Sequence, residues 1–287
     1  MSRRPRRGNC IGQPICHVSD LRWGDTALIR REGWVMAKPA VILVGADKGG
    51  VGKTTVSRAL LDYFIAHNIR TRAFDTESPK GTLKRFHPDV TEVVDMHSTA
   101  DQMKIFDTLP HTDAQVTVID IRAGLLSTTL KSLRDIGFLE AAKKAQLTFT
   151  VFHILGPSIA SLSEIDETVG FMDDAHYILV KNFINNTTFF EWDPATYNSY
   201  FRKIKDAHDI TIPKLNEMAC EQVEIASVPY VSFVANKAGD GEPGNYSFVL
   251  RGYVRHWLGN VWAEFDRVKL IDMVAPEVQR KGAARQA

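Results

Sequence analysis

From Ala40 onward the chain alternates short apolar, often β-branched runs with longer stretches whose apolar positions recur at helical spacing. Residues 40–45 are wholly apolar, which is typical of a strand buried on both faces of a parallel sheet. A glycine-rich turn follows, and then a predicted helix at 53–67. The apolar face of that helix holds Val56, Leu60, Tyr63, Phe64 and His67. This opening predicts a strand, a turn and a helix, as in a βαβ unit.

The alternation continues towards the C-terminus. Further strands are predicted at 71–75, 92–96, 115–120, 147–153, 176–181 and 226–230. Helices are predicted at 100–109, 128–144, 158–172, 194–207, 212–224 and, rich in aromatic residues, 246–268. Neither an internal repeat nor a low-complexity linker interrupts the chain after Met36. Strands that alternate with helices predict an α/β fold, a doubly wound and mostly parallel β-sheet with helices on both faces.

The first 35 residues follow neither pattern. They hold seven arginines against three acidic residues, a net charge of +4, so the rest of the chain carries −3 of the total +1. Met36 precedes the first strand, and we expect it to be the natural start, with 1–35 a dispensable extension. A disordered basic arm that contacts nucleic acid is one alternative; an Arg-rich transit peptide is another, against which stand the acidic residues and the scarcity of serine. The expected organisation is an extension at 1–35, one α/β domain at 36–270 and a tail at 271–287.

Composition limits the protein classes and cellular compartments that fit this chain. Apolar residues make up 44% and charged residues 24%, which is ordinary for a globular domain, and the near-zero charge gives no whole-molecule attraction to nucleic acid or membrane. Three cysteines are too few for a disulfide framework and favour a reducing, cytoplasmic compartment. No run approaches the roughly 18 apolar residues of a membrane span. Cys10 and the pair Cys16-His17 lack a second ligand pair, so no metal site is predicted there.

The turn at 47–55 has the sequence Asp-Lys-Gly-Gly-Val-Gly-Lys-Thr-Thr. Such a turn between a buried strand and a helix can point successive backbone N–H groups inward and cradle phosphate at the positive end of the helix. Lys53 would reach the β- and γ-phosphates, the Thr54 hydroxyl would ligate Mg²⁺, and Thr55 would lie near the α-phosphate. Asp47 stands where the strict phosphate-loop pattern has glycine. The predicted phosphate-binding residues are Gly49, Gly50, Val51, Gly52, Lys53, Thr54 and Thr55.

Two lysines, Lys48 and Lys53, flank the glycines, and the segment resembles the deviant Walker A loop of the ParA/MinD ATPases. That family includes partition, division-site and some plasmid-transfer proteins, and the resemblance runs over about residues 40–244. It implies a P-loop NTPase fold, ATP and Mg²⁺, and an ATP-dependent homodimer in which Lys48 reaches the partner's phosphates. A cation that arrives only on dimerisation would stabilise the γ-phosphate charge and so gate hydrolysis. A solvated loop lysine is the alternative.

Carboxylates end two predicted strands. Asp120 closes the apolar run at 116–120, which places it at the carboxyl edge of the sheet, where ligands of open α/β folds bind. It resembles a Walker B aspartate that holds a magnesium-bound water. Gly124 matches the family's glycine after this strand, whereas Ile121-Arg122-Ala123 departs from the usual Thr-Pro-Pro-like sequence.

The segment Asp75-Thr76-Glu77-Ser78-Pro79 is similar to the family's Asp-x-Asp-Pro segment. Glu77 takes the place of the second aspartate, which in that family orients the attacking water. Glu77 or Asp75 could assume this role here, and the alternative is that either acid only caps the next turn.

Recognition of the base is predicted from two short matches. Asn182 ends Val180-Lys181-Asn182, similar to the segment whose asparagine contacts adenine in the family, and an amide has the donor and the acceptor that a purine edge requires. Pro229 lies in Ser227-Val228-Pro229, which with Gly241-Glu242-Pro243 resembles the loop over the base. Ordinary strand-end and turn chemistry is the alternative for both.

The aromatic stripe near the C-terminus predicts a helix that packs on the core rather than one that binds membrane, because few lysines lie on its other side. Its members are Tyr253, Trp257, Val261, Trp262, Phe265 and Val268. Three basic residues in the tail form too small a footprint to predict DNA binding, and contact with nonspecific DNA stays open.

Together these features predict an Mg-ATP-dependent, dimerising switch with an unidentified activating partner, used in plasmid or DNA partition, positioning or conjugal transfer. The plasmid-transfer or plasmid-stability branch is favoured by resemblance at 75–83. One alternative is an ATP-dependent ligase of the dethiobiotin or cobyrinate synthetase type, and another is a nucleotide-binding adaptor with little turnover. An iron–sulfur carrier similar to nitrogenase reductase is not favoured, because only Cys220 follows the loop.

Overall fold

The structure is a computed structural model that describes residues 38–144, 146–156, 159–171, 175–184, 194–203 and 207–275. The described residues belong to one compact unit. The extension predicted at 1–35 and the three basic residues of the tail lie outside these ranges, and the domain boundaries stay predictions. No helix within these ranges combines the length and the apolar character required of a membrane-spanning segment.

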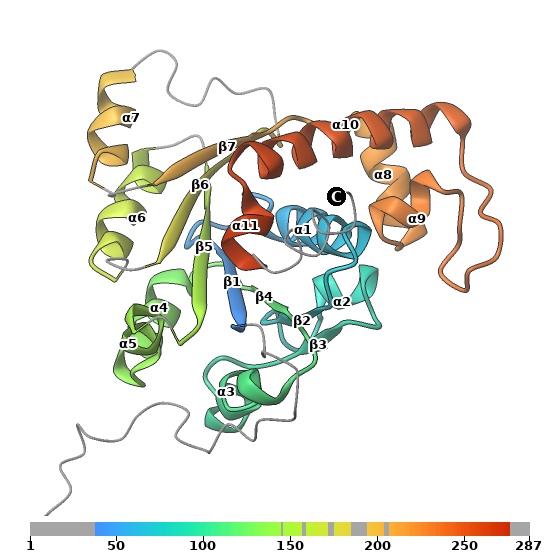
Figure 1. The fold of residues 1–287 in the computed structure, drawn as a ribbon. Helices are drawn as coiled ribbons and strands as arrows, with labels where there is room; N and C mark the ends of the chain where they lie inside the picture. The colour runs from blue at the N-terminus through green and yellow to red at the C-terminus, as the bar shows by residue number, and fades with distance from the viewer. Residues whose placement is uncertain are drawn as a thin grey trace, which may run out of the picture. The chain divides into compact units, whose positions relative to one another are not determined.

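Seven parallel strands form one sheet in the order β3-β2-β4-β1-β5-β6-β7 (Figure 1). The strands are β1 (Ala40–Gly45), β2 (Thr71–Asp75), β3 (Thr91–Val93), β4 (Val116–Asp120), β5 (Thr148–Leu155), β6 (His176–Asn182) and β7 (His208–Ile212). The order reverses at β1, because β2, β3 and β4 lie on one side of it and β5, β6 and β7 lie on the other. In open α/β sheets, ligands bind at the carboxyl ends of strands beside such a point.

Helices cover both faces of the sheet, as Figure 1 shows, with α1, α10 and α11 on one face and α4 to α7 on the other. The helices are α1 (Lys53–Ala66), α2 (Thr82–Phe86), α3 (Thr99–Phe106), α4 (Leu126–Asp135), α5 (Phe138–Lys143), α6 (Ile159–Val169), α7 (Pro194–Phe201), α8 (Glu217–Ala226), α9 (Tyr230–Val234), α10 (Phe248–Arg267) and α11 (Leu270–Val274). The predicted α/β class and parallel sheet are confirmed.

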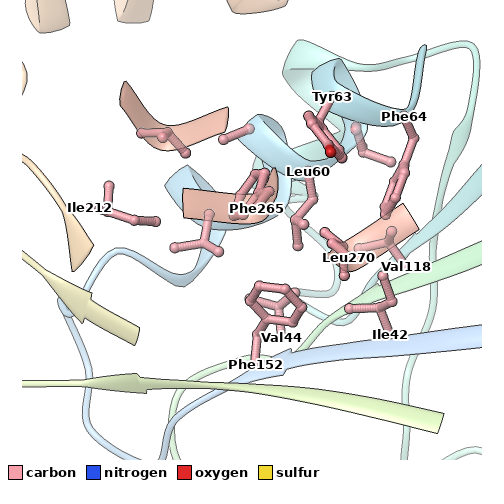
Figure 2. Packing of buried hydrophobic residues seen from close by; sticks show 14 of the residues in the cluster. Ile42, Val44, Leu60, Tyr63, Phe64, Val118, Phe152, Ile212, Phe265 and Leu270 are labelled. Atoms are coloured by element: carbon pink, nitrogen blue, oxygen red, sulfur yellow. The ribbon is translucent and has the colours of Figure 1, made fainter. Parts of the chain in front are cut away.

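The central strand shows why its sequence is wholly apolar. Ile42 and Val44 point towards α1 and α10, where they join the core cluster of Leu60 and Phe265 (Figure 2). Leu43, between them, is also fully buried and lies outside that cluster, so both faces of the strand are covered. The C-terminal stripe packs on the same core, since its members except the half-exposed Tyr253 are buried or partly buried. The prediction of core packing is therefore confirmed.

Some predicted elements are wrong. Residues 226–230 form no strand but the last residue of α8, a turn at 227–229 and the first residue of α9, with Ser227 at a φ of 51° and Pro229 as the residue before α9. The edge strand β7 lies where two helices were predicted to approach each other, so the helix predicted at 212–224 begins instead at Glu217. The helix predicted at 128–144 is two helices, because Gly137 adopts a φ of 77° between them. The short helices α2, α9 and α11 were not predicted.

Candidate functional site

The loop between β1 and α1 has the local structure that its glycines predict. Gly50 and Gly52 adopt φ values of 72° and 84°, in the left-handed region that other residues rarely enter. Gly52 is the residue before the first turn of α1, so the loop leads directly into the N-terminus of a helix. A β-carbon at Gly52 would lie 2.2 Å from Nδ2 of Asn182, which means that any larger residue would displace that side chain. Backbone conformation and close packing therefore both require glycine at this position.

Asn182 donates hydrogen bonds to the backbone of the loop. It ends β6, is buried, and its Nδ2 donates to the carbonyl oxygen of Val51 at 3.0 Å and to that of Gly52 at 3.4 Å. The amide thus fixes the orientation of these two carbonyl groups of the loop. Contact between Asn182 and a base stays a prediction, as does that of Pro229, which does not line the cavity described below.

Thr54 and Asp120 form the centre of the site. The Thr54 hydroxyl donates to Oδ2 of Asp120 at 2.8 Å, which joins the first turn of α1 to the end of β4. Asp120 is 4% exposed, and its Oδ1 has no hydrogen-bond partner among the described residues. Burial raises the pKa of this carboxyl to about 7, so the fold disfavours its charge until a cation arrives. A hydroxyl and an orphaned carboxylate oxygen are the hard oxygen donors that Mg²⁺ prefers, and the residues therefore fit this ion.

Lys53 and Lys48 occupy different places. Lys53 is 9% exposed, and its Nζ donates to the carbonyl oxygen of Lys48 at 3.3 Å. Burial lowers the pKa of Lys53 although nearby carboxylates, Asp120 first among them, oppose this shift. Lys48 is half-buried and packs at the end of β5, where a β-carbon on Gly156 would lie 3.1 Å from its Cδ. Lys48 does not line the cavity that Lys53 lines.

The two acids after β2 make different contacts. Both oxygens of Asp75 accept backbone N–H groups, Oδ1 from Glu77 at 2.9 Å and Oδ2 from Leu83 at 2.6 Å and Lys84 at 3.2 Å. Asp75 therefore caps the N-terminus of α2, the alternative that the sequence left open. Oε2 of Glu77 accepts from the hydroxyl of Thr82. The orienting role for water stays a prediction for either acid, and the contacts favour Glu77.

Residues from the loop, from the first turn of α1 and from the segments after β2 and β4 surround one cavity of about 320 Å³ at the carboxyl ends of β1, β2 and β4. Among the described residues, no three His, Cys, Asp or Glu side chains gather as an all-protein metal centre would require. The cavity is lined by Gly50, Gly52, Lys53, Thr54, Thr55, Asp75, Glu77, Asp120, Ile121, Arg122 and Ala123.

Comparisons with known proteins give distant likenesses only. No family model matches the chain, and no curated protein matches it. Two solved structures have a TM-score of 0.45: a nucleotide-binding protein from Archaeoglobus fulgidus in complex with ADP (15% identity, 64% of this chain, 85% of that one) and the MinD cell division protein of Aquifex aeolicus (14%, 77% and 97%). A third is signal recognition particle 54 kDa protein from Aeropyrum pernix in complex with GDP (17%, 82% and 50%, TM-score 0.40). Likenesses at this level do not carry function from those proteins to this chain.

Two contacts of the site had no signal in the sequence. The Thr76 hydroxyl donates to the carbonyl oxygen of Asp120 at 3.0 Å and accepts from the N–H of Arg122 at 2.7 Å, so it ties the end of β2 to the end of β4. Asp47 caps α4: its Oδ1 accepts from the N–H groups of Leu126 at 2.8 Å and Ser127 at 3.3 Å, and its Oδ2 accepts from the Ser127 hydroxyl. Capping by a residue about 80 positions away cannot be predicted from local sequence.

Replacing Asp47 with alanine is expected to lower the free energy of unfolding by about 2 kcal/mol, at the upper end of the range for lost helix caps, because two N–H groups and a hydroxyl lose their acceptor. Urea denaturation measures this change. Asp47→Asn, which keeps one side-chain oxygen for the N–H groups of α4, is the control and should lose less than half as much. Equal unfolding midpoints for Asp47→Ala and the native protein would contradict the capping role.

Proposed function

We propose that this protein is an Mg²⁺-dependent ATPase of the ParA/MinD type, which dimerises on ATP and separates after hydrolysis. The observation that carries the proposal is the convergence of Lys53, Thr54 and Asp120 on one cavity beneath the loop at 47–52. A helix N-terminus and a lysine suit phosphate, and the paired hydroxyl and buried carboxylate suit the cation that accompanies a nucleotide.

Each residue has a defined task in this proposal. The N–H groups of the loop hold the β- and γ-phosphates together with the Nζ of Lys53. This Nζ is available to phosphate because it makes a single hydrogen bond within the described structure, and that bond is long. Thr54 and Asp120 hold Mg²⁺, which when bound neutralises charge on those phosphates. Glu77 orients the attacking water from the wall formed by the end of β2. Asp75 acts indirectly, because its N-cap contacts fix the segment that carries Glu77.

Lys48 supplies the link to dimerisation. It lies beside the loop but does not line the cavity of its own subunit, a placement consistent with action on the phosphates of a second subunit. A cation that reaches the γ-phosphate only in the dimer would couple assembly to turnover. We place the biological role in plasmid or DNA partition, positioning or conjugal transfer, with an activating partner protein and possible contact with nonspecific DNA. This placement rests on the resemblance of the loop segment.

Size-exclusion chromatography with ATP, with ADP and without nucleotide, combined with a turnover assay, tests the proposal. The native protein should dimerise with ATP alone, and Lys48→Ala should stay monomeric and turn over at least about 100-fold more slowly. Lys131→Ala, which removes an exposed lysine of α4, is the matched control and should behave as the native protein. A constant oligomer that turns over ATP only when a small carboxylic acid is added would indicate a ligase instead. Nucleotide binding without turnover under any condition would indicate an adaptor.

A further inference from the structure

Arg122 is a charged residue of the cavity wall to which the proposed mechanism gives no task. It lies two residues after Asp120, just past the end of β4, whereas Lys53 begins α1. Its side chain is exposed, and within the described residues its guanidinium has neither a hydrogen bond nor an ion pair. A cation that lines a cavity without a partner is available to an anionic ligand.

The backbone at Arg122 is fixed although its side chain is not. Its N–H donates to the Thr76 hydroxyl at 2.7 Å, and Thr76 is itself buried and bonded to the carbonyl oxygen of Asp120. The preceding residue, Ile121, is buried and donates its N–H to the carbonyl oxygen of Val44 in β1. These bonds anchor the backbone at Arg122 to β1 and to the ends of β2 and β4.

The carboxylates of the same cavity are occupied by other groups. Asp75 accepts three backbone N–H groups, Glu77 accepts the Thr82 hydroxyl, and Asp120 accepts the Thr54 hydroxyl. None of them holds Arg122, although an arginine among acids commonly forms an ion pair. The planar guanidinium donates in parallel to two oxygens, which suits the equatorial oxygens of a terminal phosphate.

We infer that Arg122 is a catalytic residue that contacts the γ-phosphate of ATP from within the same subunit. This inference rests on the proposed function. In hydrolysis the water oxygen bonds to the γ-phosphorus and one of its protons passes to an oxygen of the phosphate product, while the bond from that phosphorus to the β–γ bridging oxygen breaks and its electron pair leaves with ADP. Arg122 exchanges no proton; its charge stabilises the oxygens of the transferring group. It therefore distinguishes ATP from ADP, and the second cation from Lys48 adds to it in the dimer.

The test compares Arg122→Ala, Arg122→Lys and, as a matched control, Arg255→Ala, which removes an exposed arginine of α10 outside the cavity. Arg122→Ala should lower kcat about 100- to 1,000-fold and weaken binding of adenylyl imidodiphosphate about tenfold, while ADP binding changes less than twofold. Arg122→Lys should recover part of kcat because it restores the charge without the paired donors. Arg255→Ala should match the native protein.

Two results would overturn the inference while leaving the proposed function intact. One is an unchanged kcat in Arg122→Ala. The other is an equal loss of affinity for ADP and for adenylyl imidodiphosphate, which would show that Arg122 only shapes the loop. A native protein that binds neither nucleotide in the presence of Mg²⁺ would overturn the proposed function and the inference together.

Discussion

Lys53→Met is expected to reduce ATP turnover at least 100- to 1,000-fold and to weaken nucleotide binding, while the protein without nucleotide keeps or gains stability. Activity falls because a preorganised cation at the β- and γ-phosphates is removed, a loss of about 3–4 kcal/mol in transition-state stabilisation. Stability does not fall because the fold already disfavours the buried charge, as the lowered pKa of Lys53 shows, and because its Nζ makes one long hydrogen bond. Methionine keeps the length of the side chain.

Steady-state turnover and urea denaturation of the same preparation separate the two effects. Lys131→Ala, the exposed lysine of α4, is expected to change neither quantity. Retained turnover in Lys53→Met would remove the basis of the phosphate site. A large loss of stability would instead show that Lys53 supports the fold.

Arg58→Ala is expected to lower the free energy of unfolding by about 3 kcal/mol. Arg58 is 2% exposed, and its guanidinium lies over two rings, 3.4 Å from the centroid of Phe86 and 4.2 Å from that of Tyr230. It also forms an ion pair of 2.6 Å with Glu224. Desolvated cation–π contacts contribute about 2 kcal/mol, and truncation also leaves a cavity. Its Nε and Nη2 lack partners within the described residues, which limits the net contribution. Removing this charge also takes a compensating cation from buried Asp62.

Arg85→Ala is the matched control, because Arg85 also pairs with Glu224 and lies over the Phe86 ring at 4.4 Å. Its side chain is 49% exposed, so solvent screens the pair and the expected loss is about 0.5 kcal/mol. Urea denaturation of both variants decides between burial and pairing as the source of the effect. Equal losses would contradict the argument from burial. Because Tyr230 directly follows Pro229, Arg58 also fixes the predicted base loop to α1.

Local sequence predicted the parts of the site whose geometry is local. The loop at 47–52 follows a wholly apolar strand and precedes an amphipathic helix, so its position, its glycine conformations and the placement of Lys53 at the start of that helix could be inferred from neighbouring residues. Asp120 could be placed at the carboxyl edge because it ends an apolar run of strand length. In each case the signal and the structure that it specifies lie within about ten residues of each other.

Two elements were predicted wrongly because the contacts that decide their structure are not local in the sequence. The strand β7 is short and only partly apolar, and it exists because it pairs with β6, from Ile178↔His208 to Asn182↔Ile212. The turn at 226–230 resembled a strand in composition, but Ser227 and Pro229 stop one helix and start the next. Pairing and packing partners, rather than local preference, decided both outcomes.

The sequence by itself determined the α/β class, the order of most strands and helices, and the identity of most residues around the loop at 47–52. Only the tertiary structure decided how those residues are used. It assigned Asp47 to the cap of α4, Asp75 to the cap of α2, Asn182 to the loop carbonyls and Arg122 to the cavity wall. For Asp47, Asp75 and Asn182 the physical reason is that a polar side chain bonds whichever donor or acceptor the fold brings within about 3 Å, and the partners cited lie from 8 to 131 positions away. Arg122 reaches the cavity wall because the end of β4 lies beside the loop.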